Sequence, residues 1–278
     1  MNLASQILTG RKPAAEAFRK PHLYDQLNAG ANGRLPFLGS SSKIEHGESV
    51  GILSTVLYMQ PANESGREAC AWRSPGCSAA CLAEGTGRMS MSGPRQARRR
   101  RHASFYADRA RFLTDLAGEI AAHAKKAHKL GKVAAVRLNG TTDFPWHRLR
   151  VTYNGTEYPN IHAIFPDVHF YEYTKIPLAI QSRGGLPSNL HLTFSISERA
   201  DADAYASEYL RAGFGAAVVT FTKRHIIPES FKLGRKRYQT TDGDAHDARF
   251  LDPSGSIVIL SAKGRAKTDE SGFVRATN

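Results

Sequence analysis

Residues 103–140 have the sequence ASFYADRARFLTDLAGEIAAHAKKAHKLGKVAAVRLNG, which predicts a long helix over 103–130 followed at once by a β-strand. Gly131 ends the helix after a last turn rich in Lys and His, which suits the negative end of the helix dipole. Large apolar residues recur at steps of seven, four and four, which places them on one helix face. They are Phe105, Phe112, Leu116 and Ile120.

The alternation of strands and helices extends to both sides of this stretch. Strands that alternate with helices at such spacing indicate parallel βαβ units and an α/β fold. We expect a partial (β/α) barrel of six parallel strands, although a doubly wound sheet would give the same pattern. The predicted strands are 50–60, 132–140, 168–175, 190–198, 216–222 and 256–262, and further helices are predicted at 160–166, 176–184 and 202–212, the last capped by Asp201.

Shifts in composition divide the 278 residues into three parts. Residues 1–45 mix Gly, Ser, Asn and basic residues with little periodicity, which predicts an irregular basic N-terminal arm. Residues 46–265 contain all the predicted strands and would form the barrel-like domain. Residues 266–278 would be a polar tail.

All three cysteines lie in the segment CAWRSPGCSAAC at 70–81, directly after the first predicted strand. Three thiols make no closed disulfide framework, and zinc would need a fourth ligand. Three thiolates do suit an iron–sulfur cluster of the 4Fe-4S type that keeps one iron for another ligand. We therefore expect Cys70, Cys77 and Cys81 to hold such a cluster, with a zinc site or three unliganded thiols as the alternatives.

A fourth ligand is sought among residues that the fold would bring back to the cysteines. Asp244 and His246 precede the last predicted strand, which in a barrel approaches the first. Either side chain is a candidate ligand. The alternative is a tight turn, since Asp-Gly-Asp and Pro-Ser-Gly are turn sequences.

Polar residues follow several of the predicted strands. In an α/β barrel the carboxyl ends of the strands carry the chemistry, so these residues would line the mouth of the barrel. Individually they would also suit loop starts and helix caps. As candidate catalytic residues they are Asn139, Asp143, Lys175, Ser195 and Glu198.

A net charge of +13 and a pI near 9.8 favour a polyanionic partner, and we expect nucleic acid, DNA rather than RNA. Clustered guanidinium groups repel one another unless an anion lies among them, so an arginine-rich loop over 93–102 is expected to bind phosphate. A small phosphate ligand or a solvated surface are the alternatives. The candidate contacts are Arg95, Arg98, Arg99, Arg100 and Arg101, with Lys232, Arg235, Lys236 and Arg237 in a later loop.

Other functional classes lack their sequence signals. The chain contains no G-x-S-x-G, P-loop or dinucleotide fingerprint. No run of about 18 apolar residues predicts a membrane span, and the N-terminus lacks the pattern of a secretory signal. We therefore expect a cytoplasmic protein, where the thiols stay reduced and available to metal.

A cysteine loop after the first strand of a βα series resembles the layout of the radical S-adenosylmethionine enzymes. The usual spacing there is C-x3-C-x2-C, whereas this chain has C-x6-C-x3-C. The resemblance implies S-adenosylmethionine as a cofactor and, as an alternative function, an enzyme that modifies nucleic acid or a small metabolite.

Several strings resemble the bacteriophage and prophage proteins of the gene product 88 family, over most of residues 50–275. The resemblance implies a phage or mobile-element protein in a bacterial host cell and supplies no reaction. Taken with the cysteines, we expect a phage iron–sulfur protein that binds nucleic acid; a zinc-stabilised binding module without catalysis is a further alternative. The strings are CSAACL, EGTGR, VRLNGTTDFPW, FYEYTK, LTFSISER, DGDAHDARFLDPSG and SGFV.

Overall fold

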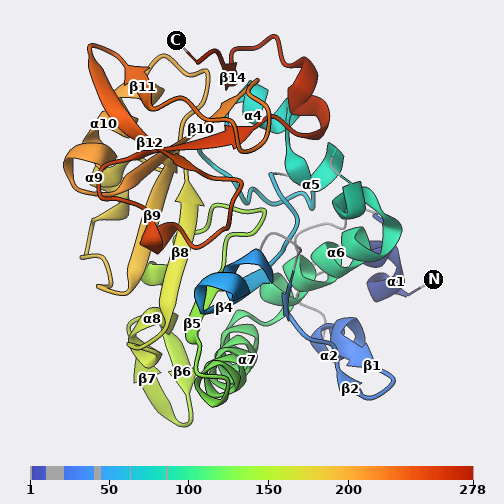
Figure 1. Cartoon of the computed structure of the whole chain (residues 1–278). Helices are drawn as coiled ribbons and strands as arrows, with labels where there is room; N and C mark the ends of the chain where they lie inside the picture. Colours follow the sequence, from blue (N-terminus) through green and yellow to red (C-terminus); the bar gives the residue numbers. More distant parts are fainter. Residues whose placement is uncertain (1, 11–21, 41–44, 63, 86, 278) are drawn as a thin grey trace.

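A computed structural model describes residues 2–10, 22–40, 45–62, 64–85 and 87–277, so part of the predicted N-terminal arm lies outside the described residues. The centre is a mixed sheet in the order β11-β12-β13-β10-β9-β8-β5-β4-β3, with β14 paired to β10 (Figure 1). These strands are β3 (Leu38–Gly39), β4 (Ile52–Leu57), β5 (Val133–Arg137), β8 (His169–Thr174), β9 (Leu190–Ser195), β10 (Gly215–Thr220), β11 (Ser230–Leu233), β12 (Lys236–Asp242), β13 (Ile257–Ser261) and β14 (Val274–Arg275).

The six predicted strands are β4, β5, β8, β9, β10 and β13. Each is parallel to the next one along the chain, so the α/β prediction is confirmed in the form of a large, mostly parallel sheet. Strands that the sequence analysis missed extend it: β12 pairs parallel with β13, while β11 and β3 pair antiparallel with their neighbours. Two small hairpins lie apart, β1 (Ala29–Gly30) with β2 (Gly33–Arg34) and β6 (Val151–Tyr153) with β7 (Thr156–Tyr158).

The helix predicted over 103–130 is wrong in its boundaries, because two helices occupy this region. They are α6 (Ser92–Ala107) and α7 (Arg109–Lys129). Asp108 lies between them in extended conformation and caps α7, its side chain accepting a hydrogen bond from the Arg111 amide at 3.0 Å. The loop predicted over 93–102 is therefore helical. Pro94 lies in the first turn of α6, where proline is tolerated.

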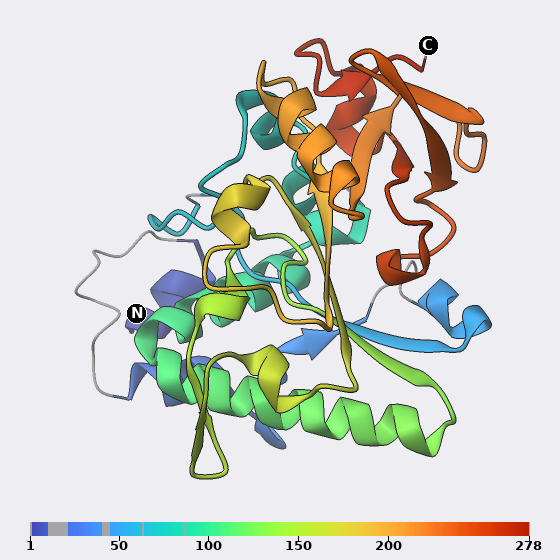
Figure 2. The same cartoon turned by 90° about the vertical axis from the view of Figure 1, so that its left-hand side faces the viewer.

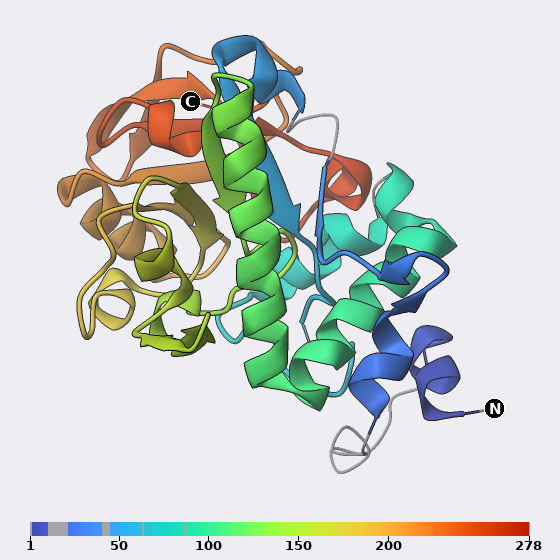
Figure 3. The ribbon, with the colours of Figure 1, turned by 90° about the horizontal axis from the view of Figure 1, so that it is seen from below.

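The long helix α7 covers one face of the sheet (Figures 2 and 3). Phe112, Leu116 and Ile120 are fully buried against the strands, and each contributes roughly 1.5–3 kcal/mol through burial. The remaining helices are α1 (Leu3–Leu8) and α2 (Leu23–Asn28), which pack on α6, and α4 (Pro75–Ala79), α5 (Leu82–Gly85), α8 (Ile161–Ile164), α9 (Leu178–Gln181) and α10 (Ala202–Arg211). Asp201 precedes α10 but makes no side-chain cap, since its carboxylate pairs with Arg199.

The opposite face of the sheet is covered near β4, β5 and β8 by the segment that links β12 to β13. Ala248 packs against Ile52 and Tyr171, and Phe250 stacks on His169 at 4.5 Å between ring centroids. Short 3-10 helices lie in the connections: η2 (His46–Val50), η3 (Gly87–Ser90), η4 (Trp146–Arg148), η5 (Arg249–Leu251) and η6 (Gly264–Thr268). Among the described residues, no helix is both long and apolar enough to cross a membrane.

The strands β9 and β10 separate at their carboxyl ends, and β14 fills the space. β9 pairs with residues 215–217 of β10, whereas β14 pairs with residues 219–220. The predicted polar tail thus contributes a strand, and Phe273 and Val274 are buried there. Figure 1 shows α4 next to β14 at this end of the sheet, and Cys77 of α4 packs against the cluster that includes Phe273 and Val274.

Candidate functional site

The cysteine segment leaves the carboxyl end of β4 and forms α4 and α5. Ser74 caps α4, its hydroxyl accepting a hydrogen bond from the Cys77 amide at 3.1 Å, and Pro75 occupies the first helical position. Cys77 lies on α4, and Cys81 precedes α5. None of the three cysteines forms a disulfide, and all three are partly buried. Charge on Cys77 or Cys81 would raise the pKa of Cys70, so both lie within electrostatic range of Cys70.

Cys70 is fixed against the loop that follows β5. Its Sγ accepts a hydrogen bond from the Ala62 amide at 3.4 Å and donates one to the Thr141 carbonyl at 3.8 Å. Burial raises the pKa of this thiol to about 12, and burial also raises the pKa of Cys77 against the opposing charge of Lys175. Both groups are therefore thiols near neutral pH, and a metal would have to displace their protons to bind.

Glu198, which follows β9, holds the start of α4. Its carboxylate accepts hydrogen bonds from the Ser74 hydroxyl and from the Gly76 amide, both at 2.7 Å. A side chain at position 76 would collide with this carboxylate and with the Ser271 hydroxyl, so the close approach requires glycine. The cysteine helix is thereby attached to a strand far away in the sequence.

Asp143 and Lys175 lie beside the cysteines. The Asp143 amide donates to the Ala69 carbonyl at 2.8 Å, and its Oδ2 accepts from the Lys175 amide at 2.9 Å. Burial raises the pKa of the Asp143 carboxyl to about 6, against the effects of the Lys175 amide and the Thr174 hydroxyl. The Lys175 ammonium donates to the carbonyl and hydroxyl of Ser195, both at 2.9 Å, and lies over the Phe273 ring.

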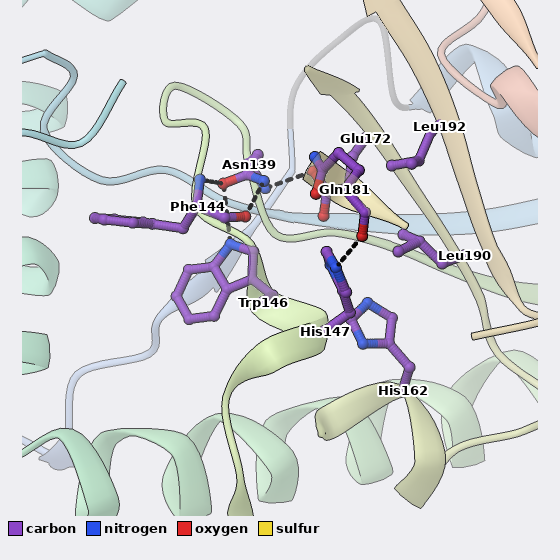
Figure 4. Close-up of a pocket in the computed structure, with 9 residues that line it drawn as sticks. All are labelled: Asn139, Phe144, Trp146, His147, His162, Glu172, Gln181, Leu190 and Leu192. Carbon is purple, nitrogen blue, oxygen red and sulfur yellow. Dashed lines mark hydrogen bonds between the residues drawn. The ribbon is translucent and has the colours of Figure 1, made fainter. Parts of the chain in front are cut away.

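Asn139 has a different place from the other predicted site residues. Its Oδ1 accepts from the Phe144 amide and the Trp146 indole, each at 2.9 Å, which shapes the loop that carries Asp143 (Figure 4). The backbone amides of Leu138 and Asn139 donate to the Glu172 carboxylate at 2.8 Å. Asn139 therefore supports the site indirectly, through the loop that carries Asp143. It lines a cavity of about 10 Å³, which is enough for roughly one water.

The structure gives Asp244 partners other than the cysteines. Its carboxylate accepts from the Ser261 amide at 2.9 Å and from the Lys263 ammonium at 2.5 Å. The carbonyl of His246 accepts from Arg249 at 2.6 Å. The segment reaches the first strands through Asp247, which pairs with Arg137 of β5 at 2.9 Å, while β13 itself is separated from β4 in the sheet.

The arginine run lies on α6, and two of its members point into the protein. Arg98 is 2 % exposed and donates to the carbonyls of Ala83 and Met89, which secures the chain that follows the cysteines. Arg100 donates to Asn28 and to the Pro36 carbonyl. Arg99 and Arg101 reach the carbonyls of Leu8 and Tyr58, and Arg95 is partly buried.

The second predicted basic group is a β-hairpin on the surface. Strands β11 and β12 are joined at Gly234, whose positive φ of 59° suits a tight turn. The four cations are all exposed, so this hairpin presents positive charge to solvent. They are Lys232, Arg235, Lys236 and Arg237.

The structure thus brings Cys70, Cys77, Asp143, Lys175 and Glu198 together from four strand ends. Across the described parts of the chain, no three His, Cys, Asp or Glu side chains are arranged to hold a metal ion. Sequence reasoning missed Ser74, Gly76 and Phe273. The order Ser-Pro-Gly before Cys77 is a helix-start signal that would have located the first two, whereas Phe273 carried no signal.

Comparison with known proteins gives one family. A family model described as "Gene product 88" matches residues 33–277. No curated protein and no solved structure matches the chain.

Proposed function

This chain belongs to the gene product 88 family, and from the site described above we propose that it is an iron–sulfur protein. Cys70, Cys77 and Cys81 would hold a 4Fe-4S cluster at the carboxyl edge of the sheet. One observation carries the proposal: Cys77 and Cys81 both lie within electrostatic range of Cys70, and Asp143 from another strand lies within range of Cys70 and Cys77.

The chemistry of the thiols also supports a cluster. Each thiolate of a four-iron cluster would bind its own iron, whereas a zinc ion would draw all three sulfurs to one centre and need a fourth ligand. A cluster would also compensate the burial that holds Cys70 and Cys77 in the thiol form, because metal binding releases thiol protons. The fixed backbone around Ser74 and Gly76 would preserve the spacing.

Anaerobic reconstitution with ferrous iron and sulfide tests this proposal. We expect brown protein with broad visible absorbance and about four irons and four sulfides per chain. Cys77→Ala should lose most of this iron, while the matched variant Ser78→Ala, one residue along α4, should keep it. Colourless protein with stoichiometric zinc would instead favour a zinc-stabilised binding module and overturn the cluster.

The exposed hairpin supports a second activity, the binding of nucleic acid, with DNA favoured. Its four cations and the net charge of +13 would attract a polyanion, whereas Arg98 and Arg100 are committed to internal carbonyls. Reversing the charge of Lys232, Arg235 and Lys236 should weaken DNA binding and reduce its salt dependence by about two to three counterions. Reversing Lys125, Lys126 and Lys129 on α7 removes the same charge and should have a smaller effect; equal effects would contradict a contact at the hairpin.

A radical S-adenosylmethionine-like enzyme remains the alternative that the strand order favours. Six parallel strands that are neighbours in chain order suit a partial barrel, with Asp143, Lys175, Ser195 and Glu198 at its mouth. In that case the reduced, reconstituted protein should cleave S-adenosylmethionine to 5′-deoxyadenosine. Its absence from the reaction, measured by liquid chromatography, would exclude the alternative.

A further inference from the structure

We infer that Asp143 supplies the fourth ligand of the proposed cluster and closes the iron that three cysteines leave open. This inference rests on the proposed iron–sulfur cluster and names a ligand that the spacing of the cysteines does not reveal. The backbone brings this residue to the cysteines: its amide donates to the carbonyl of Ala69, the residue before Cys70, at 2.8 Å. Cys70 in turn contacts the Thr141 carbonyl of the same loop.

The carboxylate of Asp143 has one oxygen to spare. Oδ2 accepts the Lys175 amide, and the Thr174 hydroxyl lies close enough to lower the pKa of the carboxyl. Oδ1 is nevertheless buried and has no partner at hydrogen-bonding geometry within the described residues. The nearby Lys175 ammonium is directed to Ser195 instead. A buried carboxylate oxygen without a donor is costly, and a bound iron would satisfy it.

The other candidate carboxylates have no such spare oxygen. Glu198 uses Oε1 for the Gly76 amide and Oε2 for the Ser74 hydroxyl. Asp244 uses its two oxygens for Ser261 and Lys263, next to β13. Asp143 is also the candidate whose charge raises the pKa of both Cys70 and Cys77.

A protein ligand on the fourth iron determines what the site can do. An iron closed by Asp143 offers no position for the methionyl group of S-adenosylmethionine. The cluster would then serve structure or electron transfer, and replacing Asp143 would create an open iron.

The test uses the full chain, reconstituted anaerobically, as wild type and as Asp143→Ala, Asp143→Cys and Asp244→Asn. The readout is the electron paramagnetic resonance spectrum of the reduced cluster before and after cyanide is added, since cyanide binds an open iron. We expect cyanide to shift the spectrum of Asp143→Ala alone. Asp143→Cys should keep four irons, and its spectrum should not change when cyanide is added. The matched carboxylate variant Asp244→Asn should behave as wild type.

The outcomes separate the ligand from the cluster. A cluster-bearing wild type whose spectrum shifts with cyanide, or an Asp143→Ala variant that responds as wild type does, overturns the assignment of Asp143 and leaves the cluster standing. A shift in Asp244→Asn alone assigns the ligand to Asp244 and also overturns it. Wild-type protein that binds no iron overturns the cluster itself. If Asp143→Ala folds poorly, which circular dichroism reports, Asp143→Cys still tests the assignment. A thiolate in place of the carboxylate on the fourth iron should change the spectrum of the reduced cluster even without cyanide, and a spectrum identical to that of wild type would overturn the assignment.

Discussion

At the scale of single residues, Glu198 fixes the cysteine helix to the sheet. Its pKa is held below the usual value despite the opposing effect of burial, because the Ser74 hydroxyl and the Gly76 amide donate to the carboxylate. Glu198→Gln removes the charge from both hydrogen bonds, so we expect the free energy of unfolding to fall by about 1–3 kcal/mol. Urea denaturation measures this.

The control for Glu198 is a nearby carboxylate on the surface. Asp201 pairs with Arg199 where both side chains are well exposed. Exposed ion pairs contribute little, so Asp201→Asn should change stability by less than about 1 kcal/mol. Equal effects of the two variants would show that Glu198 does not anchor α4.

The buried environment of Arg98 predicts that this residue stabilises the fold. Its guanidinium is almost fully buried and holds the carbonyls of Ala83 and Met89, directly after the cysteines. Arg98→Ala would leave these carbonyls without their donors, and we expect a loss of about 3 kcal/mol or more in thermal or urea unfolding. The exposed Arg235→Ala should be neutral within about 0.5 kcal/mol; similar losses would contradict a structural role for Arg98.

At the scale of elements, β14 covers the candidate site. Phe273 precedes this strand, belongs to the apolar cluster against which Cys77 packs, and lies under the Lys175 ammonium. Phe273→Ala should destabilise the protein by about 3–5 kcal/mol and speed the reaction of Cys77 with a maleimide in the metal-free protein. Phe221, 54 % exposed, gives the matched control, because Phe221→Ala removes an aromatic ring without opening the site. An unchanged Cys77 rate in Phe273→Ala would show that β14 does not shield the thiol.

The elements also show where a sequence pattern falls short. The six central strands were predictable because each contains a run of apolar residues that the sheet buries on both faces. The polar strand β12 has no such run and was missed. The break between α6 and α7 at Asp108 was not predictable. The apolar residues continue at helical spacing from Phe105 on α6 to Phe112 on α7, as they would in a single helix. β14 has two residues and is defined only by its pairing with β10.

At the scale of the whole molecule, buried histidines make stability depend on pH. Burial lowers the pKa of His162 to about 3, and neither ring nitrogen has a hydrogen-bond partner in the described residues. The unfolded chain binds this proton near pH 6.5, so stability is full above that pH and is lost as the pH falls from 6.5 towards 3. Between pH 7 and 5 the loss from this group is about 2 kcal/mol.

The variant His162→Leu isolates this effect. Its neighbours Leu190 and Leu192 line the same cavity, so an apolar side chain suits the position (Figure 4). The difference in unfolding free energy between the variant and wild type should shift in favour of the variant by about 2 kcal/mol between pH 7 and 5. A difference that stays constant with pH would show that His162 is not held neutral by the fold.

The sequence by itself determined the α/β class, the order of six strands and the concentration of all thiols after the first strand. These follow from local runs of apolar residues and from spacing, which neighbours in the chain create. Only the tertiary structure decided that Glu198 anchors α4, that Arg98 and Arg100 point inward and that Asp143 keeps a spare oxygen beside Cys70. The physical reason is that these contacts join separate elements of the chain, such as Glu198 with Gly76 and Arg100 with Asn28, which lie 122 and 72 positions apart, and no local pattern contains them.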